Sequence, residues 1–317
     1  MPGDSAFTLV QLRYFAAAAE TGSMTSAARR LLVSQSAVST AVAQLERALG
    51  VQLLIRHHAK GLSLTAAGAR FLQESRNLLA HADELVETAQ GLGAALAGEL
   101  SVGCFLSLSP FVLPRLFAEF TARHPGVRLQ AVEGETEELQ AALLDGRCEI
   151  ALMYRMDLAD SLLTEQIAEA APYALVPPGH RLAGSRGVRI EELAEDPFVL
   201  YDLPHSREYF TELFAAAGLA MRPAYRSTTF ETVRALVAAG QGYSILNQRP
   251  VSDTTYDGGR AVPVPLLDPL PPLPVVLARP RGVRPTRRAQ AFTELARRLL
   301  GTASSASHLP VSEKLGH

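Results

Sequence analysis

The sequence predicts a mainly α N-terminal head, a single long helix and a C-terminal α/β body. Three observations carry this prediction. Short apolar-periodic segments with a tight turn fill residues 9–50, a heptad pattern runs through residues 71–92, and strand-like and helix-like segments alternate from residue 98. Because a chain of 317 residues exceeds what one core ordinarily supports, several domains are expected.

Composition narrows the class of protein further. The chain is 48% hydrophobic and 20% charged, and its apolar runs fall short of the roughly 20 residues that span a bilayer. The N-terminus lacks the basic and apolar regions of a signal peptide, so we expect a cytoplasmic protein with no membrane partner. Two cysteines are too few for a disulfide framework.

Charge is distributed unevenly along the chain. The formal net charge is -2, but residues 1–65 carry six cations against three carboxylates, a net charge of +3. The remainder therefore carries -5. A basic head on an acidic body indicates that the head meets a polyanion.

Three helices are predicted in the head. The first covers about residues 9–21 and stops at Gly22; Ser23 caps the second, which runs to about Leu32; Ser34 caps the third, which ends at Gly50. In the third helix the spacing of four apolar residues predicts one buried stripe. These residues are Val38, Val42, Leu45 and Leu49.

A helix pair joined by so short a turn is typical of the helix-turn-helix unit, whose second helix enters the major groove of DNA. Residues 51–65 read as a two-stranded wing with Lys60 and Gly61 at its tip. Gln and Arg side chains read bases, while Ser, Thr and the wing cations contact phosphates. The predicted DNA-binding residues are Ser23, Thr25, Gln35, Ser36, Ser39, Thr40, Gln44, Arg56, His57, His58 and Lys60. Tight helix pairs also occur in ordinary helical bundles, which is the structural alternative.

The long helix is predicted from about Thr65 to Leu92 and carries two apolar stripes. One helix cannot bury both stripes alone, so a partner helix from a second subunit is expected. Packing on the chain's own body is the alternative. The predicted dimerisation residues are Phe71, Leu78, Leu85 and Leu92, and the neighbouring stripe holds Leu72, Leu79 and Val86.

The body alternates strands and helices, which predicts a parallel sheet with crossover helices. A Pro-rich stretch over residues 262–274 precedes a last strand and a last helix of about residues 286–300. Residues 302–317 have the composition of a disordered tail.

The predicted head and, more loosely, the body resemble a known protein family. The run "QLRYFAAAAETGSMTSAARRLLVSQSAVSTAVAQLERALGVQLLIRHHAKGLSLTAAG" is similar to the winged helix-turn-helix of the LysR-type transcriptional regulators, and looser similarity continues to about Leu300 through "GELSVG", "LDGRCEIAL" and "LVAAGQGYSILN". Ser36 stands where the family usually has Pro, Thr40 and Ala41 where it has Arg and Gln, and Leu54 where it has Phe. These departures imply a different operator preference and fewer phosphate contacts.

The resemblance implies a domain plan and a set of partners. Residues 1–65 would form the DNA-binding domain, 66–97 the linker and dimerisation helix, and 98–301 an effector-binding domain hinged like a periplasmic binding protein. Its subdomain 1 would cover about residues 98–168 and 273–301, and its subdomain 2 about 169–272. The implied partners are double-stranded promoter DNA, a small effector, a homodimer or homotetramer, and RNA polymerase.

Ligands of open α/β sheets sit beyond the carboxyl ends of the strands, which directs the search for the effector site. The predicted effector-binding residues are Ser107, Thr136, Tyr154, Asp202, His205, Ser206, Thr228 and Asn247. Ser107 and Thr136 match family positions that often contact effectors. In three segments a structural role is the alternative to effector binding. Ser109 with Pro110 is typical of a helix cap, and Thr136 could cap its own helix. Thr228 with Glu231 has capping-box spacing.

The chemistry of these side chains favours a small anionic or zwitterionic metabolite. Ser, Thr, Arg155 and helix N-termini suit a carboxylate, and Asp202 and Glu133 could meet an amine. The loop that holds Tyr201, Asp202, His205 and Ser206 is unusually polar, although a solvated loop is an equal alternative.

Motifs of enzymes are missing from the sequence. It contains no G-x-S-x-G, P-loop or zinc-type spacing, so no catalytic residue, cofactor or metal is expected. The glycine-rich stretch from Gly91 fails the dinucleotide fingerprint because Leu96 holds its sixth position. Cys104 and Cys148 are expected to be buried, inert thiols, with a redox switch as the alternative. The competing function is a small-molecule binding protein whose head serves protein association only.

Overall fold

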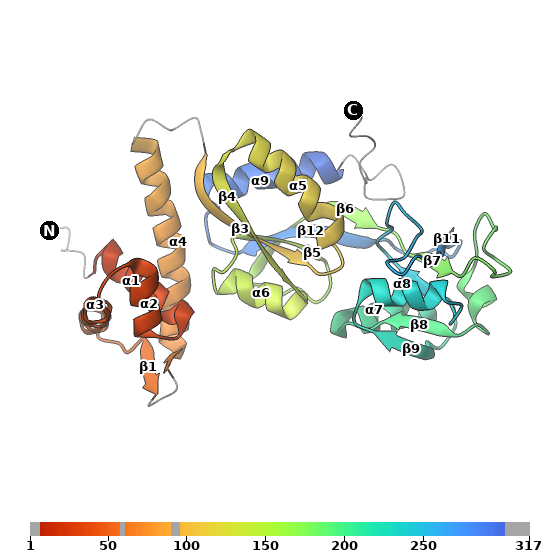
Figure 1. Ribbon diagram of the computed structural model, residues 1–317, viewed down its shortest axis with the longest axis horizontal. Coiled ribbons are helices and arrows are strands. Elements are labelled where there is room, and N and C mark those ends of the chain that lie inside the picture. The colour runs from red at the N-terminus through yellow and green to blue at the C-terminus, as the bar shows by residue number, and fades with distance from the viewer. Residues whose placement is uncertain (1–6, 58–60, 90–95, 302–317) are drawn as a thin grey trace.

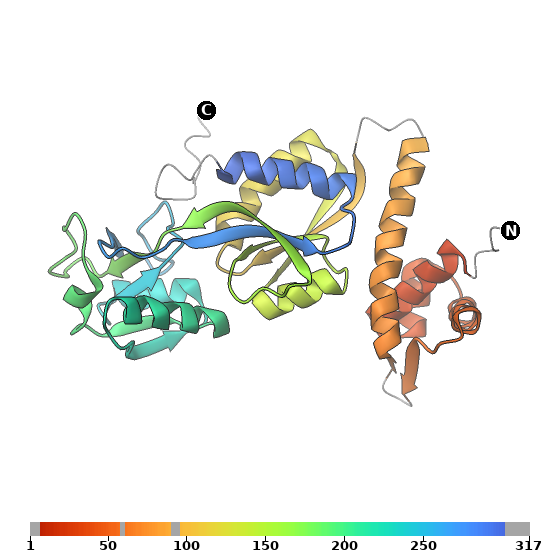
Figure 2. The same cartoon turned by 180° about the vertical axis from the view of Figure 1, so that it is seen from behind.

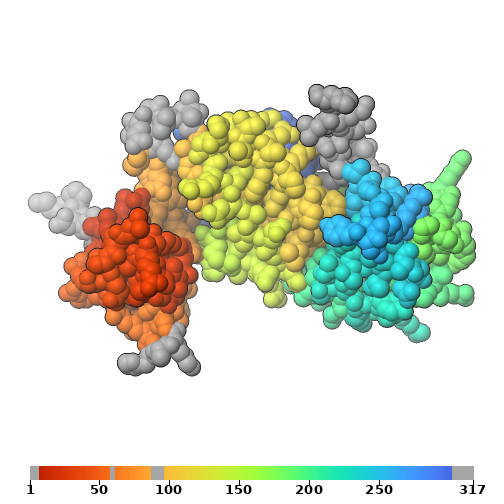
Figure 3. All heavy atoms as spheres, in the orientation of Figure 1, coloured from red at the N-terminus to blue at the C-terminus, as the bar shows by residue number. Residues whose placement is uncertain are grey.

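The computed structural model describes residues 7–57, 61–89 and 96–301, which form three lobes in a row (Figure 1, Figure 3). The head stands at one end, and the body divides into subdomain 1 beside it and subdomain 2 at the far end. The long helix α4 lies between the head and subdomain 1, as the view from behind also shows (Figure 2). Within the described ranges no helix has the length and apolarity to cross a membrane.

The head contains the three predicted helices, and the predicted caps define their ends. Ser23 Oγ accepts a hydrogen bond from the Ser26 amide at 3.3 Å, and Ser34 Oγ accepts one from the Ala37 amide at 3.1 Å. Gly22 and Gly50 close two of the helices with φ of 61° and 67°, where a side chain would be strained. The helices are α1 (Leu9–Thr21), α2 (Met24–Leu31) and α3 (Gln35–Leu49).

The wing is a two-stranded antiparallel sheet of β1 (Leu54–His57) and β2 (Gly61–Leu64). The predicted positions His58 and Lys60 lie outside the described residues. The head has its own core, which is built around Phe15 and receives the predicted stripe of α3 except for Leu49, which stays half-buried. The buried members of this core that come from α3 and the wing are Val38, Val42, Leu45, Leu53 and Leu54.

Helix α4 (Ala66–Ala89) begins after Thr65, whose Oγ1 accepts a hydrogen bond from the Gly68 amide at 2.9 Å. Its first half packs on the head, where the Phe71 ring lies 5.6 Å from that of Phe15. The head of the same subunit thus contacts part of the predicted dimerisation seam. Farther along, the side chain of Leu85 is 71% exposed. The predicted position Leu92 lies beyond the described part of the helix.

Subdomain 1 is a five-stranded mixed sheet in the order β4-β3-β5-β12-β6. The predicted parallel pairing holds for β3 with β4 and β5, but β12 runs antiparallel to both of its neighbours. Helices α5 and α9 cover one face of the sheet and α6 covers the other (Figure 1, Figure 2). The elements are β3 (Ala97–Phe105), α5 (Ser109–Arg123), β4 (Gly126–Gly134), α6 (Thr136–Leu144), β5 (Ile150–Tyr154), β6 (Leu162–Ala170), β12 (Leu273–Pro280) and α9 (Arg287–Gly301).

The prediction of an all-parallel sheet is wrong because two strands connect the subdomains. Strand β6 leaves subdomain 1 toward subdomain 2, and β12 returns from it, so the two lie antiparallel side by side. The sequence analysis missed β6, in which Thr164 and Gln166 break the apolar pattern that marks the other strands. A crossover helix does not precede either strand.

Subdomain 2 contains a three-stranded antiparallel sheet in the order β10-β7-β11 and a parallel pair of β8 with β9. Strand β11 falls in the Pro-rich stretch, for which the sequence predicted no strand. It is an edge strand, where Pro263 and Pro265 are tolerated because one side of the strand needs no amide donors. The elements are β7 (Tyr173–Val176), η1 (Ile190–Leu193), β8 (Phe198–Tyr201), α7 (Pro204–Ala216), β9 (Pro223–Ser227), α8 (Phe230–Ala238), β10 (Ser244–Leu246) and β11 (Val262–Pro265).

Candidate functional site

Helix α3 presents a polar face to solvent. Its apolar residues face the head core, so Gln35, Ser36, Thr40 and Gln44 are left exposed on the other side, with Ser39 half-buried at the edge. Gln44 Oε1 accepts a hydrogen bond from Gln11 Nε2 at 3.3 Å, and the Ser36 hydroxyl lies 3.0 Å from that of Ser34. The predicted recognition residues therefore share one accessible surface.

The wing joins this surface. Arg56 Nη2 donates to Ser39 Oγ at 3.3 Å, which holds an exposed guanidinium beside α3. His57 Nε2 lies 2.7 Å from Ser63 Oγ on the paired strand. On α2, Thr25 is exposed, whereas the hydroxyl of Ser23 is engaged in capping.

Two exposed cations of the head, Arg29 and Arg47, are not among the predicted DNA-binding residues. Arg29 lies in the last turn of α2 and Arg47 in the last turn of α3. Both belong to the six cations of residues 1–65, and that charge is the signal in the sequence that points to them.

A cleft between the subdomains encloses a small cavity of about 20 Å³. Both subdomains contribute to it, and its polar lining consists of hydroxyl, phenol and amide groups. The lining residues are Ser107, Tyr154, Met156, Tyr201, Ser206, Tyr209, Phe210, Phe230, Leu246, Asn247, Gln248 and Leu273. Of the predicted effector residues, the structure thus brings Ser107, Tyr154, Ser206 and Asn247 together.

Hydrogen bonds organise this lining, and the one between Gln248 and Tyr154 crosses the cleft. The Tyr154 hydroxyl accepts from Ser107 Oγ at 3.4 Å and from Gln248 Nε2 at 3.0 Å, and burial raises the pKa of this phenol. Asn247 Nδ2 donates to the Tyr209 hydroxyl at 2.7 Å. Sequence reasoning missed Gln248 and Tyr209. Gln248 follows Asn247 directly, and Tyr209 lies one helical turn after His205.

A wider groove of about 550 Å³ opens on the outer side of the same cleft. Ser107, Tyr201 and Phe230 line both spaces. The Phe111 ring of α5 lies 5.7 Å from the Phe230 ring of α8 in a T-shaped contact that joins the subdomains. Thr228 belongs to this groove rather than to the inner cavity.

Two predicted helix caps are wrong. Helix α5 begins one residue earlier than expected, because Leu108 is its cap position and the Ser109 hydroxyl donates to the Glu133 carboxylate instead. Helix α8 has Thr229 at its cap position, and Glu231 accepts hydrogen bonds from Arg234 at 2.6 Å and the Tyr256 amide at 2.7 Å. Thr228 is therefore not part of a capping box.

Thr136 and His205 each hold an unpaired buried polar atom. Thr136 is fully buried, and Glu135, not Thr136, caps α6. Neither Thr136 Oγ1 nor His205 Nε2 has a hydrogen-bond partner among the described residues. His205 Nδ1 lies 4.0 Å from Asp157 Oδ2, so this side chain of subdomain 2 faces a carboxylate of subdomain 1.

Asp202 does not have the free carboxylate that the sequence led us to expect. Arg207 Nε donates to its Oδ1 at 2.7 Å, and Arg226 Nη1 donates to its Oδ2 at 3.2 Å. The hydrogen bond from Arg207 is the main cause that lowers the pKa of Asp202. Two cations from the same subdomain already compensate this charge, which leaves it unsuited to a ligand amine.

Both cysteines are buried, as predicted. Burial is the main cause that raises the pKa of each thiol, to about 12 for Cys148. A thiol protonated at neutral pH is a poor nucleophile, which argues against the redox alternative.

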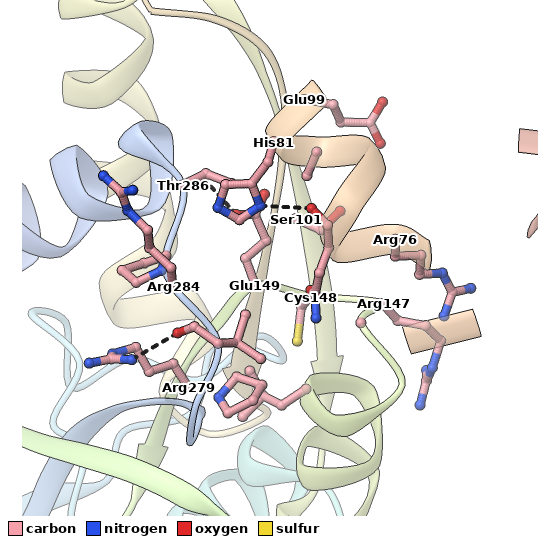
Figure 4. Close-up of a pocket in the computed structure, with 17 residues that line it drawn as sticks. Arg76, His81, Glu99, Ser101, Arg147, Cys148, Glu149, Arg279, Arg284 and Thr286 are labelled. Carbon is pink, nitrogen blue, oxygen red and sulfur yellow. Dashed lines mark hydrogen bonds between the residues drawn. The ribbon is translucent and has the colours of Figure 1, made fainter. Parts of the chain in front are cut away.

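A further cavity of about 170 Å³ lies between α4 and subdomain 1 (Figure 4). Glu149 projects between His81 of α4 and Thr286, whose Oγ1 donates to its Oε2 at 2.6 Å. Arg279 and Arg284 point away from Arg76 and Arg147 on the opposite side. In the part of the chain that the structure describes, no group of three or more His, Cys, Asp or Glu side chains could hold a metal ion.

Comparison with known proteins agrees with this geometry. Residues 9–69 match the model of the bacterial regulatory helix-turn-helix protein, lysR family, and residues 93–301 match that of the LysR substrate binding domain. The chain is 34% identical over 292 residues to a probable hydrogen peroxide-inducible genes activator of Streptomyces viridosporus, covering 91% of this chain and 92% of that protein.

Solved structures extend the likeness to the whole chain. HinK, a LysR family transcriptional regulator from Pseudomonas aeruginosa, matches with 38% identity and a TM-score of 0.64, over 93% of this chain and 99% of that one. Full-length CbnR in complex with its target DNA matches with 26% identity and a TM-score of 0.55, over 92% and 99%. The family consists of transcriptional regulators, which confirms the prediction that the protein is not an enzyme. The chain belongs to the LysR family of transcriptional regulators, with a helix-turn-helix head and a C-terminal effector-binding domain.

Proposed function

We propose that this protein binds promoter DNA as an oligomer through α3 and the wing, and that a small carboxylate-bearing metabolite in the cleft between the subdomains controls this binding. The exposed polar face of α3, with Arg56 held beside it, is the observation that carries the proposal. Such a face matches the size and chemistry of the major groove. The solved CbnR–DNA complex supports the same use of the head in a relative.

The sequence predicted an anionic or zwitterionic effector. The side chains of the cavity support the carboxylate group of such a molecule. The hydroxyl groups of Ser107 and Ser206 meet in the cavity and can donate to carboxylate oxygens, whereas Asn247 Nδ2 already donates to the Ala170 carbonyl and the Tyr209 hydroxyl. For an amine, both predicted carboxylates are already engaged, Asp202 by two arginines and Glu133 by the Ser109 hydroxyl. We therefore favour an anionic metabolite over a zwitterionic one. The cavity is small, so binding must widen the cleft.

Peroxide sensing, which the name of the Streptomyces relative suggests, is a second candidate that the structure of the thiols does not favour. Cytoplasmic location stays a prediction from the composition and the N-terminal sequence, and contact with RNA polymerase stays one from the family resemblance.

A gel-shift titration tests the proposal. The purified full-length chain is titrated onto the intergenic fragment beside its own gene and onto a shuffled fragment of equal length, at several salt concentrations. We expect preference for the intergenic fragment and a linear fall of log K with log salt. Equal binding to both fragments, or no binding at low salt, would refute DNA recognition. If the chain binds neither fragment but associates with other proteins, the result would instead support the alternative in which the head serves protein association only.

A further inference from the structure

We propose that α6 transmits the state of the effector cleft to the DNA-binding head through Arg76, a positioning residue on α4. This inference rests on the proposed function. Helix α6 has one end at the cleft and the other end against α4, and each end makes specific contacts that the next paragraphs describe.

The guanidinium of Arg76 bonds the head and subdomain 1 at the same time. Its Nε and Nη2 donate to Glu20 Oε1 of α1 at 3.0 and 2.9 Å, and its Nη1 donates to the carbonyl of Asp145, the residue that caps α6. The Arg76 side chain is only 15% exposed. A planar guanidinium with several fixed donors holds two acceptors in a defined relative position, which a point charge could not do.

The backbone after α6 is pressed against the same side chain. Gly146 has φ of 67°, and a Cβ built there would lie 3.2 Å from Arg76 Cδ. A movement of the segment after α6 toward α4 would therefore meet the Arg76 side chain directly. Farther along α4, Glu84 accepts a hydrogen bond from the amide of Arg287. This second contact gives α4 a fixed point about which it can rotate.

At its other end, α6 faces subdomain 2. Burial raises the pKa of Glu135, the capping residue, Glu138 adds to that rise, and His205 of α7 opposes it. Gln140 of α6 accepts a hydrogen bond from the Ala159 amide at 2.7 Å and so holds the loop that carries Asp157. The 4.0 Å approach of His205 to Asp157 crosses the cleft.

Helix α6 is suited to act as a strut between these two ends. Its nine residues span roughly 13 Å at about 1.5 Å each. Leu139, Ala142 and Leu143 are fully buried against the sheet. Packed helices shift as rigid bodies because interfaces of this kind do not deform continuously. Opening of the cleft at His205 would thus displace Asp145 and, through Arg76, the head.

A different use of the neighbouring cavity, as an anion site, is not supported. The arginines around it diverge, and Glu149 occupies its centre (Figure 4).

Distance measurements between spin labels test the coupling without an effector. Labels are attached to cysteines introduced at exposed positions of the head and of α5, Ala48→Cys and Ala122→Cys, and labelled subunits are diluted with unlabelled ones. His205→Glu opens the cleft, because it places a carboxylate opposite Glu135 and Asp157. We expect this substitution to shift the head-to-body distance by about 2 Å or more. In an Arg76→Ala background the same substitution should produce no shift.

The control is Arg115→Ala, which removes an arginine from a surface ion pair on α5 and should leave the His205→Glu shift intact. An equal shift with and without Arg76, or no shift in either, would overturn the inference. The distance measurement needs neither DNA nor effector. If it contradicts the coupling while the same samples still give a normal gel shift, the coupling is wrong and the proposed DNA binding stands.

Discussion

Leu32 stands where a β-carbon is costly. It ends α2 with φ of 55° and ψ of 41°, in the left-handed region, and its side chain is 93% exposed, so no burial compensates the strain. Asn adopts this conformation more readily than most residues. We expect Leu32→Asn to stabilise the head by about 0.5–1 kcal/mol, measured by native-state hydrogen exchange of its buried amides. Leu32→Ala lacks the short polar side chain that lets Asn adopt this conformation and should give no comparable gain; equal gains in both variants would contradict the explanation.

Gln35 is the first residue of α3 and lies on its exposed face. A side-chain amide there can pair with a base edge in the major groove. Gln35→Ala should reduce discrimination at one base position by about 1–3 kcal/mol, which a binding-site selection would reveal. Arg29→Ala, on the neighbouring helix, should instead weaken binding to all sequences alike. An unchanged sequence preference for Gln35→Ala would remove this residue from the recognition surface.

Asp202 contributes a pH-dependent term to stability. Its pKa is lowered in the folded protein by Arg207 and then by Arg226, so its stabilising contribution is present above the ordinary aspartate pKa of about 4. It is lost as the pH falls through the folded value. Asp202→Asn should therefore destabilise the protein at pH 7, and the difference from the wild type should shrink below about pH 4. Urea titrations at a series of pH values would check this; a difference that grows on acidification would be inconsistent with the ion pairs.

At the scale of elements, local signals were the reliable part of the sequence. Ser23, Ser34, Gly22 and Gly50 lie within one turn of the groups that they cap, so their role needs no distant partner. Where a helix end sits against another segment, the same signals misled. Ser109 had the residue type of a cap, but Glu133 from the neighbouring strand binds its hydroxyl.

Gly68 determines how closely α4 approaches the head. It lies in the first turn of α4, and a Cβ there would lie 2.0 Å from the Leu53 carbonyl oxygen. Although Ala favours helix formation, Gly68→Ala should destabilise the head by about 1–3 kcal/mol, because the backbone must move to relieve the overlap. Chemical denaturation followed by head-specific fluorescence labels would measure it. Gly184→Ala, where a Cβ meets nothing within 4 Å, is the matched control and should be nearly neutral.

At the scale of the whole molecule, α4 leaves an apolar stripe uncovered. Leu78, Leu85 and Val86 are 45%, 71% and 53% exposed. A second copy of the chain would bury them, as the heptad pattern predicts. We expect Leu85→Lys to shift the protein toward monomer in analytical ultracentrifugation, with Glu74→Lys on an exposed position of the same helix as control. A Leu85→Lys variant that keeps the oligomeric state of the wild type would assign the stripe elsewhere.

Only part of the candidate site could be predicted from the sequence, and the reason is physical. Tyr154 ends β5 and Ser107 follows the end of β3, and the carboxyl ends of these parallel neighbouring strands are brought together by the sheet itself. Asn247 follows the end of β10 in subdomain 2. Gln248 and Tyr209 complete the cavity through hydrogen bonds across 94 and 38 residues of sequence. No local pattern reports such contacts.

By itself, the sequence determined the three helices of the head, their caps, the length of the described part of α4 and the family, because hydrophobic period and capping depend on residues within a turn of each other. Only the tertiary structure decided that β6 and β12 connect the subdomains antiparallel, that Arg207 and Arg226 neutralise Asp202, and that Arg76 joins Glu20 to the end of α6. Those features arise where segments distant in sequence pack together, and the energy that selects them comes from burial and charge pairing at the contact, which no single segment encodes.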